Sequence, residues 1–289
     1  MRLGRTARSR VSCPGTQGLI LPFLVALAVH VAPRSCAGTT AIVPDDYPTV
    51  QLGIDSGADS IVVRAGTYPE RVTLIPPVPR VLLADPAAAP RPTLQGLTLH
   101  TDRSNDKRMT VIGIHVLGGV QVLPGPYGTL KVFEACSFDS GIGHGPHGPP
   151  DTNDVDSILV RNCTIRGDVQ LRVGQFTMES DTVAAGGASL HTVNYACSVR
   201  NCWFRGPGTS SLYFGRAALS VEEMAPGSAS IAGNVVENCQ VGMGLAYVSS
   251  ALIEDNVVRN CQIGISVRSG GPSSALNKPS LSQVHGRRS

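Results

Sequence analysis

Three aspartates lie close together in one stretch rich in glycine and proline, at Asp151, Asp154 and Asp156. Carboxylate oxygens are the ligands that Ca²⁺ prefers, so the cluster indicates a calcium site, and no other cofactor is expected. Inverting glycoside hydrolysis needs two carboxylates about 6.5–9.5 Å apart, and Asp168 is a further candidate for such a pair. The alternative interpretation of the cluster is a solvated acidic loop.

Imidazole and guanidinium groups occur in the same region, at His144, Arg166 and Arg172. A surface on which acids and arginines alternate suits an extended acidic sugar chain. If the chain is an enzyme, the two expected classes are polysaccharide lyase and glycoside hydrolase. The residues expected in a carbohydrate groove are His144, Asp154, Asp156, Arg166, Asp168 and Arg172.

A short pattern that recurs along the chain predicts the elements that would position these groups. It consists of two apolar residues, a charged residue, a position that is usually Asn, then Cys, any residue and a bulky apolar residue. The five copies carry Cys136, Cys163, Cys202, Cys239 and Cys261. Two degenerate copies place Ile114 and Thr182 at the Cys position. The resulting spacing, about 20 residues between most copies, favours an all-β solenoid of stacked coils.

The cysteines are expected to point inward as one structural row along the solenoid. A reduced, buried ladder is the favoured interpretation, and disulfides between Cys136 and Cys163 or between Cys239 and Cys261 are the alternative. A zinc site is disfavoured because no Cys-x-x-Cys occurs and no His accompanies the row. The asparagines that precede the cysteines are expected to form a hydrogen-bonded ladder.

Residues 1–37 have the pattern of a secretory signal peptide, with arginines ahead of an apolar stretch and small residues at its end. The stretch is too short for a permanent membrane span, so a secreted, periplasmic or cell-surface location is expected. Its removal takes away five arginines and no acid, which leaves 24 − 5 = 19 basic and 21 acidic residues, a formal charge of −2. Such a chain has no electrostatic reason to bind nucleic acid.

Two features resemble the pectin-lyase-like superfamily. Asn-Cys is followed by an apolar residue and glycine at residues 238–242 and 260–264, and a Gly-Thr-Tyr turn follows a short strand at residues 66–68. The resemblance implies a right-handed parallel β-helix over residues 42–268 with a short N-terminal capping helix. Thr49 would be the N-cap of that helix, and residues 269–289 would form a disordered tail. Because no second cap is visible, the C-terminal end could contact a partner or another copy.

Gly143-His144-Gly145 resembles the Gly-His-Gly step of polygalacturonases, but the rest of that signature is missing, so we interpret the match as chance. Two long intervals hold insertions after Phe138 and after Phe204, which are expected to rise from one face. We expect an acidic polysaccharide or cell-surface glycan to bind between them, within residues 139–228. The alternatives are a non-catalytic surface or adhesive solenoid and, less favoured, a periplasmic metal-handling protein.

Overall fold

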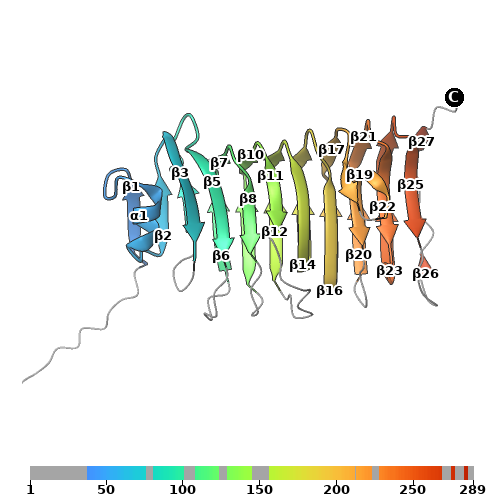
Figure 1. The fold of residues 1–289 in the computed structure, drawn as a ribbon, viewed down its shortest axis with the longest axis horizontal. Coiled ribbons are helices and arrows are strands. Elements are labelled where there is room, and N and C mark those ends of the chain that lie inside the picture. The colour runs from blue at the N-terminus through green and yellow to red at the C-terminus, as the bar shows by residue number, and fades with distance from the viewer. Residues whose placement is uncertain are drawn as a thin grey trace, which may run out of the picture. The chain divides into compact units, whose positions relative to one another are not determined.

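The computed structural model describes residues 38–75, 81–100, 108–123, 129–144, 156–211, 213–222, 228–268, 275–276 and 283–285. The expected signal peptide therefore lies outside the described residues. The described chain is an all-β parallel solenoid of about nine turns, in which strands of successive coils lie side by side (Figure 1). Every strand pairing in these ranges is parallel except one, between β18 and β19. No helix in the same ranges is long and apolar enough to cross a bilayer.

Three ladders of parallel strands run along the solenoid, and each coil contributes one strand to each ladder. Ladder A is formed by β1 (Thr40–Val43), β2 (Ser60–Val63), β4 (Val81–Ala84), β6 (Arg108–Ile112), β9 (Leu130–Glu134), β12 (Ser157–Arg161), the second parts of β14 (Asp168–Glu179) and β16 (Ala188–Arg200), β20 (Ser228–Ala232), β23 (Ser250–Glu254) and β26 (Ala275–Leu276).

Ladder B has the shortest strands. It is formed by the first parts of β3 (Thr67–Leu74) and β5 (Thr93–His100), then β7 (His115–Val116), β10 (Ser137–Phe138), β13 (Thr164–Ile165), β15 (Thr182–Val183), β17 (Trp203–Arg205), β21 (Val235–Glu237), β24 (Val257–Arg259) and β27 (Gln283–His285).

Ladder C is formed by the second parts of β3 and β5, then β8 (Val120–Leu123), β11 (Gly141–His144), the first parts of β14 and β16, β19 (Gly215–Glu222), β22 (Val241–Ala246) and β25 (Ile263–Arg268). The antiparallel strand β18 (Thr209–Ser211) pairs with β19.

The core lies inside the coils because alternate residues of each strand point inward. In ladder A, Val111, Phe133 and Val160 pair in register, and all three side chains are fully buried. Each inward residue thus packs on its equivalent in the coils above and below, which is why no coil could bury its apolar side chains alone.

The predicted single row of five cysteines is wrong, because the Asn-Cys step occurs at two different corners of the coil. Cys136, Cys163 and Cys202 follow ladder A and precede the paired residues of ladder B. Cys239 and Cys261 instead follow ladder B. Both corners need a left-handed residue before the Cys, which Asn adopts readily, so the local sequence is the same at the two places.

The interior column at the corner between ladders A and B contains other residue types besides cysteine. Ile114 occupies it as predicted, but Asp181 rather than Thr182 does so two coils after Cys136. Asn234 and Asn256 complete the column in the later coils. This inner column is therefore Ile114, Cys136, Cys163, Asp181, Cys202, Asn234 and Asn256.

Hydrogen bonds link the coils along this inner column. The backbone N–H of Cys163 donates to Asp181 Oδ1 at 2.6 Å, and that of Cys202 donates to Asn234 Oδ1 at 2.9 Å. The N–H of Asn234 donates in turn to Asn256 Oδ1 at 2.9 Å. Burial raises the pKa of Asp181 to about 7, although two backbone N–H groups oppose the shift. Side chains of one coil thus satisfy the corner backbone of its neighbour.

One short helix, α1 (Val50–Asp55), lies at the residues where a helix is predicted. Thr49 is its N-cap and accepts a hydrogen bond from the Leu52 N–H at 3.2 Å. Val50 and Ile54 are buried against the first coils. At the other end, β26 and β27 add short strands to ladders A and B beyond residue 268, the predicted end of the β-helix.

The two insertions leave the coil at different corners, so the expectation that they rise from one place is wrong. The first lies between β11 and β12, after ladder C, and residues 145–155 of it are outside the described residues. The second lies between β17 and β19, after ladder B, and includes β18. It folds back on the outside of ladder C as a hairpin of residues 209–211 and 213–217, called here the β18–β19 hairpin.

Candidate functional site

Of the six residues predicted for a carbohydrate groove, the structure separates those that it describes. Asp154, and the proposed calcium ligand Asp151, lie outside the described residues. His144 is the last residue of β11, where its backbone pairs with that of Val122. Within the described ranges, no three His, Cys, Asp or Glu side chains are grouped as metal ligands would be.

Asp156 does not reach the surface. Its side chain is fully buried and pairs with the equally buried ammonium group of Lys131. The Thr129 backbone N–H also donates to Asp156 Oδ1, at 2.8 Å. A buried carboxylate that is paired and hydrogen-bonded in this way fixes the chain where the loop ends and β12 begins, and it is not available to a substrate.

Arg166 belongs to a row of charged groups along ladder B and its corner with ladder C. Its guanidinium donates to Asp139 Oδ1 at 2.9 Å, and Nε2 of His115 lies 3.2 Å from Asp139 Oδ2. The three residues come from three successive coils, and Arg166 is the most exposed of them. Arg166 therefore has a carboxylate partner of its own.

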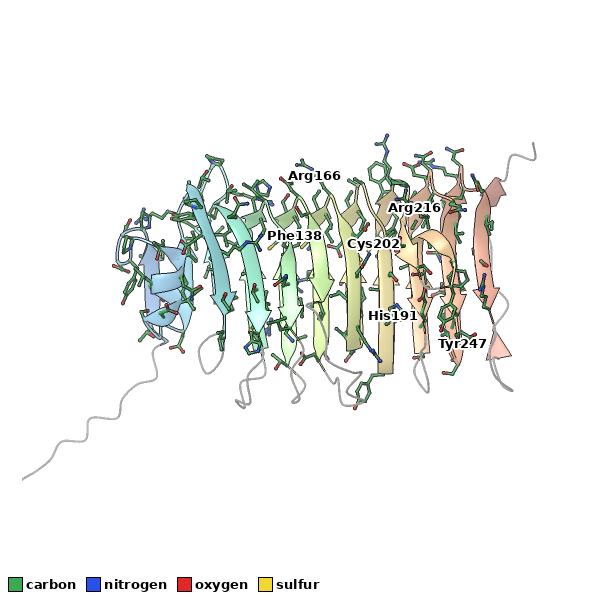
Figure 2. All side chains as sticks on the ribbon, viewed as in Figure 1. Phe138, Arg166, His191, Cys202, Arg216 and Tyr247 are labelled. Atoms are coloured by element: carbon green, nitrogen blue, oxygen red, sulfur yellow. The ribbon has the colours of Figure 1, made fainter. Side chains whose placement is uncertain are left out.

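Asp168 and Arg172 are both on β14, but at opposite ends of its ladder C segment. Asp168 stands at the corner, where its Oδ1 accepts a hydrogen bond from the Gly187 N–H at 3.3 Å. Arg172 is four residues further on, about 13 Å along the strand. Figure 2 shows Arg166 at the upper edge of the coils and His191, the residue paired with Arg172, lower down.

The outer surface of ladder C is the part of the predicted face on which polar groups gather. Two outward columns run along it, because residues one strand apart pair in register. In the first column, Gln170 pairs with Ser189, which pairs with Ser220. In the second column, Arg172 pairs with His191, which pairs with Glu222. Nearer the N-terminus, the first column continues through Gly143, Gln121 and Thr98.

Among the described residues of the second column, Glu222 supplies the carboxylate, and its side chain is fully buried. It accepts a hydrogen bond from the Ser211 hydroxyl, and its Oε2 lies 3.3 Å from His191 Nε2. Ser211 also accepts from the backbone N–H groups of Tyr213 and Phe214, at 3.3 and 3.1 Å. These contacts fix the β18–β19 hairpin to the ladder.

Arg172 differs from the other basic side chains discussed because the described part of the chain gives it no carboxylate partner. It is half-buried beside His191, which is 28% exposed. Its neighbour Gln170 is exposed and donates from Nε2 to Thr209 Oγ1 of the hairpin, at 3.0 Å. A guanidinium group, an imidazole and an amide therefore lie on two neighbouring strands, and the amide contacts the hairpin.

The hairpin covers the C-terminal half of the same surface with aromatic side chains. The Phe214 ring lies on Gly244, where a Cβ atom would collide with it, and the Arg268 guanidinium stands 5.5 Å from the ring centre. The Tyr213 and Tyr247 rings pack edge to face with centres 4.9 Å apart. Ladder C thus has an open polar half and a covered half.

His191 and Glu222 were not named among the predicted site residues, although the insertion that forms the hairpin was expected to flank the binding surface. His191 and Glu222 lie in strands of different length, separated by the hairpin insertion, so their register is not readable from spacing. A usable signal existed in the alternation of β16, where Ser189 and His191 are the outward polar residues between buried Ala188 and Leu190.

The fold defines the chain as an all-β parallel solenoid with a polar surface on one ladder. Comparison with protein-family models, with curated proteins and with solved structures gives no match.

Proposed function

We propose that this chain is an exported, right-handed parallel β-helix of the pectin-lyase-like type that binds an acidic polysaccharide along the open half of ladder C. In this proposal α1 caps the first coil. The observation that carries the binding site is Arg172, a half-buried cation without a carboxylate partner among the described residues, on a row of hydrogen-bonding side chains.

The chemistry of this surface suits a sugar acid. A guanidinium group donates two parallel hydrogen bonds to a carboxylate, and charge-assisted bonds are about twice as strong as neutral ones. Gln121 and Gln170 are both exposed, on coils separated by the coil of Gly143, and they present amide donors and acceptors to hydroxyl groups. The repeat of about 4.8 Å between strands would let an extended polymer meet similar groups at each coil.

Binding is favoured over hydrolysis by the state of Glu222. A glycosidase of the usual kind needs two carboxylates flanking the bond that is cleaved. On the described part of ladder C between β14 and β19, Asp168 is at the corner and Glu222 is beneath the hairpin, partnered by Ser211 and His191. We therefore propose a binding protein, and a lyase or hydrolase is the competing outcome of the test.

The test is affinity electrophoresis of the full chain in gels that contain polygalacturonate or a neutral glucan. We expect retardation by polygalacturonate alone, weakening as salt is added. Arg172→Gln should lower the affinity by about tenfold, the loss expected for one charge-assisted contact. Chromatography of the polymer after incubation reports any cleavage.

The matched control is Arg64→Gln. Arg64 is an exposed arginine on the first coil, paired with Asp45 at 2.5 Å, so its loss changes the net charge equally but leaves ladder C intact. It should bind like the wild type. Equal losses in both variants would show a non-specific charge effect, and no retardation of the wild type would favour the adhesive solenoid instead.

A further inference from the structure

Two thiols lie next to each other at the corner between ladders B and C, in the last two full coils. Cys239 Sγ and Cys261 Sγ are 2.8 Å apart, and both residues follow strands that pair in register, β21 and β24. Equivalent residues on neighbouring parallel strands are about 4.8 Å apart, within the Cα range that a disulfide accepts. The backbone therefore needs no rearrangement to accept a bond between them.

Accessibility distinguishes this pair from the other adjacent pair. Cys261 is partly exposed, and its S–H donates to the Arg259 carbonyl at the surface, whereas Cys239 is 6% exposed. Cys136 and Cys163 are 1% and 2% exposed, and the Cys136 N–H donates to Cys163 Sγ at 3.4 Å. An oxidant can reach Cys261 but not the inner column.

The acidity of the thiols agrees with this difference. The pKa of Cys261 is lowered to about 7 because Cys239 and nearby backbone N–H groups hydrogen-bond its sulfur. The pKa of Cys239 is raised by that same contact and by burial. Since the thiolate is the nucleophile in disulfide exchange, Cys261 is the thiol that reacts first near neutral pH.

We propose that Cys239 and Cys261 form a selective disulfide site that joins the last two full coils when the protein meets a low-molecular-weight disulfide. The Cys261 thiolate attacks one sulfur of the small disulfide, breaking its S–S bond and releasing one thiolate. Cys239 then displaces the second small thiolate from Cys261 and forms the Sγ–Sγ bond. The protons of the two protein thiols end on the two released thiols, so the protein is oxidised by two electrons and the small disulfide is reduced.

The experiment is peptide mapping of the full chain after exposure to oxidised glutathione, with free thiols alkylated under denaturing conditions. Arg259 lies between the two cysteines, so trypsin separates them into residues 217–259 and 260–268 unless a disulfide joins them. We expect this pair of peptides to be linked. The inner pair falls in residues 132–161 and 162–166, and these should remain separate and alkylated.

Two variants test the order of the steps. In Cys239→Ser, Cys261 should stop as a mixed disulfide that carries one glutathionyl group. In Cys261→Ser, Cys239 should react at least about tenfold more slowly than Cys261 does in the wild type. Slow labelling of Cys136 in the native state confirms that each variant is folded.

The wild-type map alone can overturn the proposal, whatever the variants do. A Cys261 that remains a free thiol or a stable mixed disulfide would show that Cys239 cannot reach it. Linkage of residues 132–161 to 162–166 at the same rate would show that the two pairs do not differ in access.

Discussion

The two corners that carry an Asn-Cys step have nearly the same local sequence but different environments. At the corner between ladders A and B, Cys163 and Cys202 are buried and their N–H groups donate to side chains of the next coil. At the corner between ladders B and C, Cys261 is partly exposed and contacts mainly its partner thiol. The dipeptide sets the backbone conformation, and the neighbouring coil decides whether the cysteine is structural or reactive.

The strongest test of this contrast compares two asparagines, one at each corner. Asn234 is fully buried and bonds Cys202, Asn256 and the Val199 carbonyl. Asn234→Ala leaves buried backbone groups without partners and should lower the free energy of unfolding by about 4 kcal/mol. Denaturant unfolding measures this value.

Asn238→Ala is the comparison at the other corner. Asn238 is exposed, and its side chain accepts one hydrogen bond, from Asn260 at 3.3 Å. Asn238→Ala should lower the free energy of unfolding by about 1 kcal/mol, because alanine is disfavoured in a left-handed conformation. Equal losses in the two variants would mean that the buried hydrogen bonds of Asn234 contribute no more to stability than the left-handed preference of Asn238 does.

The second test uses the pH dependence that Asp181 gives to the inner column. Its folded pKa of about 7 lies above the ordinary value of 3.8, so folding favours the neutral acid. The stability that this provides is complete below about pH 4 and is lost as the pH rises through about 7. The free energy of unfolding of the wild type should therefore fall between these values.

Asp181→Asn keeps the side chain neutral, and Asn234 and Asn256 show that this column accepts amides. The variant should match the wild type near pH 4 and be about 4 kcal/mol more stable at pH 8. Thermal melts across this range check the difference. A constant difference at every pH would show that folding does not raise the pKa of Asp181.

The smallest expected effect concerns the residue before the inner column. Ala135 has φ of 53°, a left-handed conformation that costs a residue with a Cβ about 1–2 kcal/mol. Ala135→Gly should stabilise the fold by about 0.5–1 kcal/mol, since the flexibility of glycine in the unfolded chain offsets part of the gain. Asn162→Gly, at the equivalent position with φ of 55°, should change little. If both variants were stabilised by a similar amount, Asn would be no more favourable than Ala at this left-handed position.

The sequence predicted the solenoid because β-branched residues and the Asn-Cys step return at a nearly constant interval. It misassigned Cys239 and Cys261 because strands in both ladder A and ladder B end in a left-handed residue, and the pattern does not say which ladder it ends. Asp181, Asn234 and Asn256 were not predicted as members of the inner column. A residue belongs to this column because its side chain fits the next coil, and residue type alone does not reveal that fit.

The candidate site was less predictable than the fold. Arg172 was identified and does lie on the proposed surface, but Asp156 was misread as exposed. Its partner Lys131 is 25 residues earlier, and only the stacking of coils reveals their pairing. Glu222 was missed because its burial comes from the β18–β19 hairpin, whose position depends on packing between Phe214 and Gly244.

If ladder C binds a polysaccharide as proposed, the β18–β19 hairpin also limits the length of ligand that it can bind. A sugar chain running along ladder C from β5 crosses β8, β11 and β14 and meets the hairpin at β16, a path of about 20 Å. Oligosaccharides should gain affinity with each added unit until they fill this path, and longer polymers should gain none. The antiparallel β18–β19 pair would then determine the length of polymer that ladder C can bind.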